Sequence, residues 1–246
     1  MTVKEDLWRK LRHEKLHMTL IDPEDHPGKA AASIAAAAER AGSDAIMIGG
    51  STGYTHADLD ASVGAIKARV DLPVILFPTS ASLLTPRADA IYFMVMMNSR
   101  DPRFLTREQM RGAPLVRLLC IEPISMGYII VAPGMKVGRV GRAEPVARTD
   151  SATAAAYALA TQYLGMACVY LEAGSGAPQP VPASMVRTVK SAISIPLLVG
   201  GGIRSPDQAK AAATAGADII VTGTAVERSA DPYRKLASLV KAVKGR

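Results

Sequence analysis

A tyrosine and a carboxylate stand two residues apart where an apolar run ends. Tyr170 and Glu172 close the stretch Cys-Val-Tyr-Leu-Glu, and residues two apart on a strand point to the same side of the sheet. If that side faces a substrate, the Glu172 carboxylate could accept a proton from a substrate hydroxyl. The same carboxylate could instead pair with a nearby arginine or lysine, and the sequence leaves both interpretations open.

Oxygen ligands follow two other apolar runs. Asp22 comes directly after one run, and Ser51 and Thr52 follow the next run and its two glycines. Carboxylate and hydroxyl oxygens suit a hard cation such as Mg²⁺, which proteins often hold through a few contacts together with substrate phosphates. Asp22 could equally cap or turn the chain ahead of Pro23.

Glycines end two apolar runs near the C-terminus. The run at 197–199 breaks into three glycines, and the run at 219–221 opens into Thr222, Gly223 and Thr224. The residues between them carry the signals of one helix: a capping serine, a proline at the first position and a stopping glycine. This order predicts a parallel βαβ unit whose backbone N–H groups could converge on a phosphate. Tight turns alone would also use some of these glycines.

Eight apolar runs alternate with helical patterns along the chain. Strands are predicted over residues 18–21, 45–48, 74–77, 91–97, 128–131, 168–171, 197–199 and 219–221. Helices are predicted over residues 3–16, 27–41, 56–69, 104–120 (broken near Gly112 and Pro114), 151–164, 182–192, 205–216 and 230–244. This alternation predicts an α/β fold, a single (β/α)₈ TIM-type barrel over residues 1–246. The polar residues at the strand ends would then share one face, where such barrels build their active sites.

The connection between the third and fourth predicted strands is too short for a normal helix. It has only about a dozen residues and is rich in serine, threonine and proline. We therefore predict that the barrel lacks its third outer helix and exposes a slot there. Residues 80–88 would form one wall of the slot, with Leu83 and Leu84 as candidate contacts to an apolar chain.

Composition narrows the classes of function. The net charge of +7 is spread along the chain, and aromatic residues make up only 4%. We therefore predict no nucleic-acid partner, and instead anionic small molecules or an acidic membrane surface. Neither a transmembrane run nor a secretory signal is visible, which predicts a cytoplasmic protein. Cys120 and Cys168 are expected to be buried thiols, and the histidines, His17 among them, to be surface or turn residues.

Five motifs resemble the geranylgeranylglyceryl phosphate synthases of archaea and their bacterial heptaprenylglyceryl phosphate synthase relatives. They occupy residues 19–24, 48–52, 170–177, 199–204 and 222–224, and the resemblance covers nearly the whole chain. The Tyr-Leu-Glu loop with its Ser-Gly is the specific part, because Val-Gly-Gly-Gly-Ile-Arg recurs in many phosphate-binding barrels. The family is known for a barrel without its third helix, which agrees with the short connection.

The resemblance implies a prenyltransferase acting on sn-glycerol 1-phosphate and geranylgeranyl diphosphate. The ether bond it forms would be the first committed step of archaeal membrane lipid biosynthesis. The resemblance also implies that Asp22 and Ser51 hold Mg²⁺ on the diphosphate, that Glu172 and Tyr170 are catalytic, and that the protein is a homo-oligomer, a dimer or hexamer. The residues expected to hold glycerol phosphate are Tyr170, Leu171, Glu172, Ala173, Gly174, Ser175, Gly176, Gly201, Gly202, Gly223 and Thr224.

Other functions stay open at this point. A phosphosugar isomerase or synthase would use the same phosphate site but would need neither an apolar slot nor a metal at Asp22. A basic barrel without catalysis could bind acidic lipid or RNA, with a steep dependence on salt. A member with heptaprenyl specificity would differ only in the length of its prenyl donor.

Overall fold

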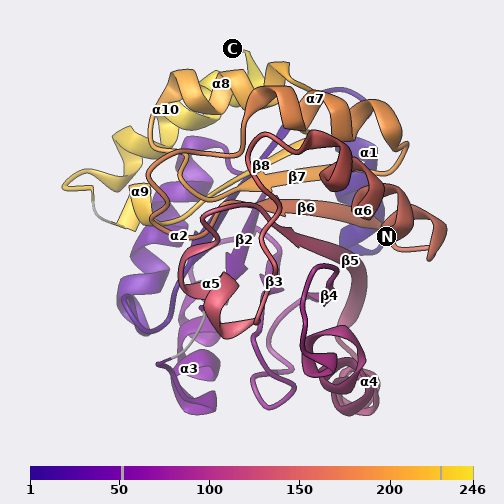
Figure 1. Cartoon of the computed structure of the whole chain (residues 1–246). Helices are drawn as coiled ribbons and strands as arrows, with labels where there is room; N and C mark the ends of the chain where they lie inside the picture. The colour runs from indigo at the N-terminus through magenta and orange to yellow at the C-terminus, as the bar shows by residue number, and fades with distance from the viewer. Residues whose placement is uncertain (51–52, 228, 246) are drawn as a thin grey trace.

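The computed structural model describes residues 1–50, 53–227 and 229–245, and the eight strands among them form a closed parallel barrel (Figure 1). The strands are β1 (Leu16–Ile21), β2 (Ala45–Ile48), β3 (Val74–Leu76), β4 (Ala90–Met96), β5 (Glu122–Ile130), β6 (Cys168–Glu172), β7 (Leu197–Gly200) and β8 (Ile219–Thr222). Strands β1 and β8 pair through Met18 and Val221, which closes the ring. The predicted α/β barrel is confirmed.

Helices alternate with the strands and cover the outside of the barrel. The longer ones are α2 (Lys29–Ala41), α3 (His56–Lys67), α4 (Glu108–Leu118), α6 (Ser151–Tyr163), α7 (Ala183–Ala192), α8 (Pro206–Thr214) and α10 (Pro232–Lys244). Three short helical segments lie in connections: the π-helix η1 (Arg103–Arg107), α5 (Met135–Val140) and α9 (Thr224–Glu227). The first helix, α1 (Val3–Lys10), contributes Leu7 to the apolar cluster inside the barrel. The Glu122 carboxylate accepts hydrogen bonds from the N–H groups of Val3 and Lys4 at 2.6 and 3.1 Å.

Strand side chains alternate between two apolar clusters. Met18, Tyr92 and Tyr170 belong to the cluster inside the barrel, whereas Leu171 and Val199 belong to the cluster between the sheet and the helices. This alternation has a period of two residues, as in any strand. It sends the Tyr170 side chain toward the barrel interior and the Leu171 side chain away from it.

No helix occurs in residues 77–89, all of which the structure describes and which connect β3 to β4. The gap lies between α3 and α4, where only loops are drawn (Figure 1). The Thr85 hydroxyl donates to Asp60 of α3 at 2.6 Å, which fastens the connection to its neighbour. The prediction that the third outer helix is missing is confirmed.

The predicted break in the helix over residues 104–120 is wrong. Helix α4 runs through Gly112 and Pro114 without interruption, after the single π-helical turn η1. Gly112 faces inward, where a Cβ would lie 3.6 Å from the Cβ of Ala81. Pro114 and Met110, whose carbonyl loses its intrahelical donor to the proline, are both exposed residues. Strand β5 also differs, since it begins at Glu122 rather than at residue 128.

Two further expectations about single side chains are wrong. His17 is completely buried: one ring nitrogen lies 2.9 Å from the Ser43 hydroxyl and the other 2.9 Å from the Thr222 hydroxyl. His17 lies between Leu16 and Met18, whose side chains point into the barrel, so its own side chain points outward. There it belongs to a polar network that holds the end of β8. Cys120 is exposed, because it lies in a left-handed turn (φ 54°) beyond the end of α4; Cys168 is buried as expected.

The burial of His17 predicts an acid-sensitive fold. Burial lowers the pKa of His17 to about 3, and the Lys244 ammonium adds to this effect. The unfolded chain binds a proton on this side chain below about pH 6.5, while the folded chain does not until about pH 3. As the pH is lowered from about 6.5 to about 3, the free energy of unfolding should therefore fall by about 1.4 kcal/mol for each pH unit. Urea titrations across this pH range should show a shallower pH slope for His17→Gln; equal slopes would contradict this account.

Candidate active site

Two cavities open at the carboxyl ends of the strands and share one wall. We call the larger, mainly apolar one the groove, and the smaller one, lined by glycines of β7 and β8, the glycine pocket. The residues that line both are Leu20, Glu172, Ser175, Gly223 and Thr224. A molecule in the groove and another in the glycine pocket would therefore meet beside the Glu172 carboxylate.

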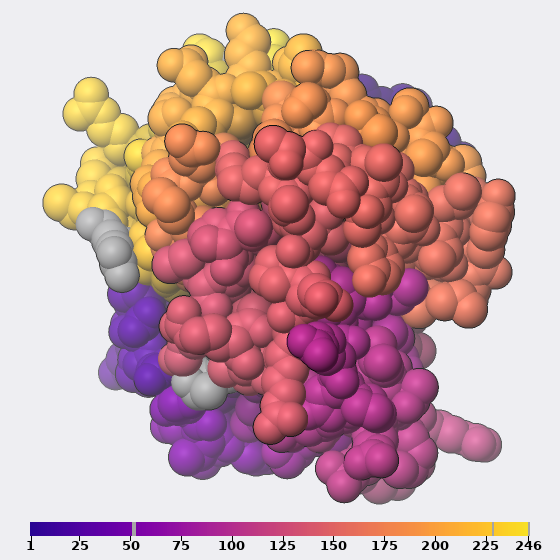
Figure 2. Space-filling model, in the orientation of Figure 1, coloured from indigo at the N-terminus to yellow at the C-terminus, as the bar shows by residue number. Residues whose placement is uncertain are grey.

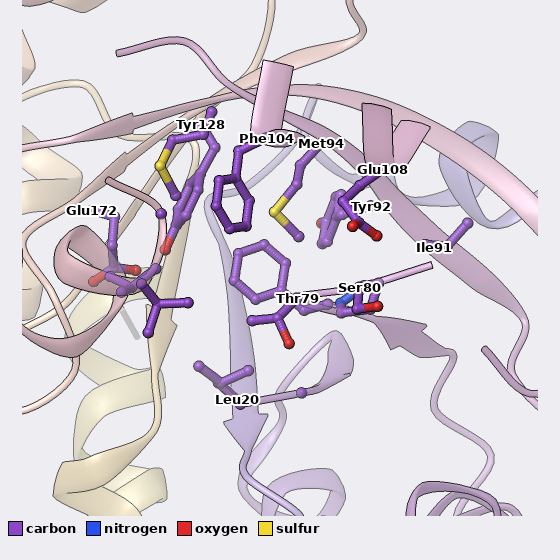
Figure 3. Close-up of a pocket in the computed structure, with 18 of the residues that line it drawn as sticks. Leu20, Thr79, Ser80, Ile91, Tyr92, Met94, Phe104, Glu108, Tyr128 and Glu172 are labelled. Carbon is purple, nitrogen blue, oxygen red and sulfur yellow. The ribbon is translucent and has the colours of Figure 1, made fainter. Parts of the chain in front are cut away.

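The groove runs from Glu172 across the barrel mouth to the gap where the third helix is missing. Phe77, Tyr92 and Tyr128 line it near the barrel axis, and Leu84 and Val116 line it near the gap. Figure 3 shows Glu172 at one end, with the Phe104 and Met94 side chains along one wall and Leu20 and Thr79 across from them. The missing helix thus leaves room for an apolar chain between residues 77–84 and α4.

Two glycines of the glycine pocket have backbone conformations that favour glycine over other residues. Gly201 and Gly202 have left-handed φ angles of 80° and 72°, which side chains other than glycine rarely adopt. A Cβ on Gly201 would also collide with the Glu172 carboxylate and would lie 2.6 Å from the N–H nitrogen of Gly174. The bare backbone here leaves N–H groups open to an anion. Across the pocket, the hydroxyls of Ser175 and Thr224 lie 2.6 Å apart and join the β6 and β8 loops.

Glu172 is a buried carboxylate whose chemistry is set by its surroundings. It is only 5% exposed, and it accepts a hydrogen bond from the Gly174 N–H at 2.6 Å. Burial raises the pKa of Glu172, while the Gly174 N–H and the hydroxyls of Tyr170 and Tyr128 partly counteract that rise. A carboxylate with a raised pKa is a stronger base than one in water, and it is held in place by three donors.

The same burial predicts that Glu172 destabilises the free protein at neutral pH. A carboxyl with a raised pKa contributes stability while it is protonated, and this contribution is lost as pH rises through the raised value. Glu172→Gln keeps the shape without the charge, so it should melt at a higher temperature than the parent protein at neutral pH. The difference should shrink toward acid pH, as calorimetry at several pH values would measure. A variant that melts lower at neutral pH would contradict a raised pKa.

Asp22 is the half-buried carboxylate on the other side of the groove. Burial raises the pKa of Asp22 to about 6; the neighbouring Asp25 and Glu24 carboxylates raise it further, while the Glu24 N–H and Lys136 lower it. Lys136 of α5 pairs with Glu24 at 3.2 Å. Rose-coloured atoms, the colour of the chain around α5 in Figure 1, lie near the centre of the face that Figure 2 shows. The elevated pKa indicates a carboxylate that would gain from a bound cation.

The structure places the predicted site residues in different surroundings. Tyr170, Glu172, Ser175, Gly176, Gly201, Gly202, Gly223 and Thr224 line the glycine pocket, and Asp22 lines the groove. Leu171 and Ala173 point into the outer apolar cluster, and Gly174 reaches the site through its N–H alone. Ser51 and Thr52 lie outside the described residues.

Sequence reasoning missed an aromatic cluster at the centre of the site. Phe77, Tyr92, Tyr128 and Tyr170 come from four consecutive strands or the ends of these strands, with ring centroids 5.2–6.2 Å apart. It also missed Arg204, which lines the glycine pocket and donates to the carbonyls of Gly176 and Pro178 at 2.9 and 3.0 Å. The one signal for the aromatic cluster is that each of these four apolar runs contains an aromatic ring.

Fold and cavities define a (β/α)₈ barrel that combines a glycine-lined pocket with an apolar groove. The PcrB family model matches residues 8–243, and the chain belongs to the PcrB family. It is 54% identical to the geranylgeranylglyceryl phosphate synthase of Thermococcus kodakarensis over 96% of this chain and 95% of the relative. It is 50% identical to the enzyme of the same name from Thermoplasma acidophilum, over 99% and 96% of the two chains.

A solved structure supports the same family. The crystal structure of (S)-3-O-geranylgeranylglyceryl phosphate synthase from Thermoplasma acidophilum, in complex with its substrate sn-glycerol-1-phosphate, matches with a TM-score of 0.97 and 49% identity over the full length of both chains. The resemblance drawn from the motifs is thereby confirmed, and the chain is an enzyme of the prenyltransferase class.

Proposed function

We propose that this protein transfers a geranylgeranyl group from its diphosphate to sn-glycerol 1-phosphate and forms an ether bond. The observation that carries the proposal is that the groove and the glycine pocket meet at Glu172. An apolar groove suits a prenyl chain, and exposed backbone N–H groups beside glycines suit a phosphate. The name of the relatives and the glycerol phosphate in the Thermoplasma structure support the same pair of substrates.

In this proposal each part of the site has a role. With its phosphate in the glycine pocket, glycerol phosphate would present a hydroxyl to Glu172, which the Gly174 N–H holds in place at 2.6 Å. The hydroxyl oxygen forms a bond to the first prenyl carbon as the bond from that carbon to diphosphate breaks. The hydroxyl proton passes to Glu172, and diphosphate leaves with the bonding electron pair. The apolar walls of the groove exclude water, which would otherwise compete as the nucleophile.

The metal in this proposal is Mg²⁺ at Asp22. A half-buried carboxylate with a pKa raised to about 6 is a donor that fits a hard cation. Ser51 remains the second predicted ligand, outside the described residues, and those described include no group of three or more histidine, cysteine or acidic side chains positioned to hold a metal alone. This fits a cation that binds mainly with its substrate; when bound, it would neutralise charge on the departing diphosphate.

A single assay separates this function from the alternatives. The protein is incubated with sn-glycerol 1-phosphate and prenyl diphosphates of several lengths, with and without Mg²⁺, and the products are analysed for an ether. Geranylgeranyl ether that forms only with Mg²⁺ is the expected result, and a preference for a longer donor would indicate the heptaprenyl type. Turnover of phosphosugars without ether formation, or salt-sensitive binding without turnover, would contradict the proposal.

The lining of the groove predicts which residue limits the length of the prenyl donor. Leu84 is 4% exposed and lines the groove near the gap, whereas Leu83, the other predicted contact, does not line it. Leu84→Phe should therefore shorten the longest prenyl diphosphate accepted, since each buried CH₂ contributes about 0.8 kcal/mol to binding. Leu83→Phe is the matched control and should leave chain length unchanged. Competition between donors of different lengths measures this; equal losses for all donors would contradict it.

The remaining expectations concern the state of the protein in the cell. None of the described helices is long and apolar enough to cross a membrane. We propose that the enzyme works in the cytoplasm as a homo-oligomer, a dimer or hexamer, and that its reaction is the first committed step of archaeal membrane lipid synthesis. Light scattering on the purified protein tests the oligomer, and a mass equal to one chain would contradict it.

A further inference from the structure

Helix α4 presents apolar and basic side chains together on its outward side. Met110, Leu115 and Leu118 are 65%, 40% and 75% exposed, which is unusual for large apolar residues. We define the α4 outer face by six exposed residues, the last residue of η1 and five residues of α4: Arg107, Met110, Arg111, Leu115, Arg117 and Leu118. Arg107, Arg111 and Leu118 follow helical spacing (i, i+4, i+11), so they form one stripe with the others on either side.

The opposite side of the same helix lines the groove. Glu108, Gln109, Gly112 and Val116 all contribute to the groove wall. One helix therefore separates the apolar groove from solvent, with the α4 outer face on its far side. Whatever binds that face will lie next to the cavity proposed for the prenyl chain.

The charges on η1 and α4 together distinguish between the surfaces that could cover the α4 outer face. Residues 103–118 include four arginines and one acidic residue. That residue, Glu108, is only 12% exposed and is occupied by Arg103 at 2.8 Å and the Ala81 N–H at 2.8 Å. A second copy placed by two-fold symmetry would bring arginines against arginines. An anionic surface that also accepts apolar side chains complements this face better.

We propose that the α4 outer face docks on the surface of an anionic lipid membrane and holds the groove at the lipid boundary. Basic and apolar side chains on one helix face are the features by which surface helices lie in the headgroup region. The proposal extends the proposed function, because a docked enzyme could exchange a prenyl chain or its lipid product with the bilayer. Such a site binds without a membrane-spanning segment.

Vesicle flotation tests the docking directly. The full-length protein, without substrates, is mixed with vesicles of phosphatidylcholine alone or with about one-third phosphatidylglycerol, an anionic lipid. We expect binding to the anionic vesicles only. Each arginine near the surface should contribute about fivefold, so Arg107→Gln combined with Arg117→Gln should weaken partitioning about twenty-five-fold. Leu118→Ser should weaken it as well, through loss of apolar contact.

A matched control removes equal charge elsewhere. Arg187 of α7 and Lys210 of α8 are also exposed, and these helices lie at the other side of the molecule from α4 (Figure 1). The double variant Arg187→Gln and Lys210→Gln should keep most of its binding. Circular dichroism on all variants establishes that each one is folded.

Three results would overturn the docking proposal. They are the absence of wild-type binding to anionic vesicles, equal losses in the two double variants, and a Leu118→Ser variant that changes the oligomer mass but not vesicle binding. The last result would assign the face to a contact between copies. The ether assay and the vesicle assay test separate claims. Vesicle binding without ether product would contradict only the proposed function. Ether product without vesicle binding would contradict only the docking.

Discussion

Replacement of Glu172 by glutamine should lower kcat by about 10²–10⁴-fold, the range expected for loss of a general base. The variant keeps an acceptor for the Gly174 N–H, so the barrel and both cavities should remain formed. Glycerol phosphate affinity should fall less than kcat if the carboxylate acts mainly in the chemical step. Steady-state kinetics at saturating concentrations of both substrates separates the two effects.

A pH profile gives this prediction a second readout. Because burial raises the pKa of Glu172, the acid limb of kcat/KM should lie above the pH at which a solvent-exposed glutamate titrates, about 4.3. At saturating Mg²⁺, which keeps the Asp22 carboxylate ionised, the limb should disappear in Glu172→Gln. Glu144→Gln, at an exposed carboxylate near the barrel mouth, is the matched control and should behave as the parent enzyme. Near-normal kcat in the Glu172 variant would remove this side chain from the mechanism.

Asp22→Asn should remove most activity when Mg²⁺ is scarce. Changes in the surroundings of a metal ligand typically cost about 10–100-fold in metal affinity or activity, and loss of a charged ligand should cost at least as much. The Mg²⁺ concentration that gives half-maximal activity should rise, and activity should recover at high Mg²⁺. Glycerol phosphate binding, measured by calorimetry, should stay close to that of the parent protein because the glycine pocket does not include Asp22.

Asp25 supplies the control for this prediction. It also lines the groove but is exposed, so Asp25→Asn should change the Mg²⁺ dependence much less. An unchanged Mg²⁺ dependence in Asp22→Asn would refute the metal assignment. Equal shifts in both variants would indicate a general effect of charge at the barrel mouth instead of a ligand.

Sequence patterns predicted those parts of the site that depend on local order along the chain. The glycines after β7 and β8, the helix cap at Ser205 and the short β3–β4 connection are all local features, and each is found in the structure. The closed barrel follows from the alternation of strands and helices, because parallel neighbours need crossovers.

Side-chain direction and distant neighbours could not be predicted in the same way. Leu171 was included in the site through the resemblance of its whole motif, although the period of two that puts Tyr170 and Glu172 on one side places Leu171 on the outer side of the barrel. His17 is buried by Ser43 and Thr222, which come from other parts of the chain. Leu83 and Leu84 are adjacent leucines, so the sequence does not distinguish them. Only packing in the short connection decides that Leu84 lines the groove.

The most direct test of the proposed reaction follows the oxygen atom of the glycerol hydroxyl. sn-Glycerol 1-phosphate labelled with ¹⁸O at its 3-hydroxyl is incubated with geranylgeranyl diphosphate, Mg²⁺ and the enzyme, and product and diphosphate are analysed by mass spectrometry. We expect an ether whose bridging oxygen carries the label and diphosphate that is free of it, because in the proposed reaction the glycerol hydroxyl attacks the prenyl carbon beside Glu172. An ether without the label, or no ether at all, would contradict that reaction.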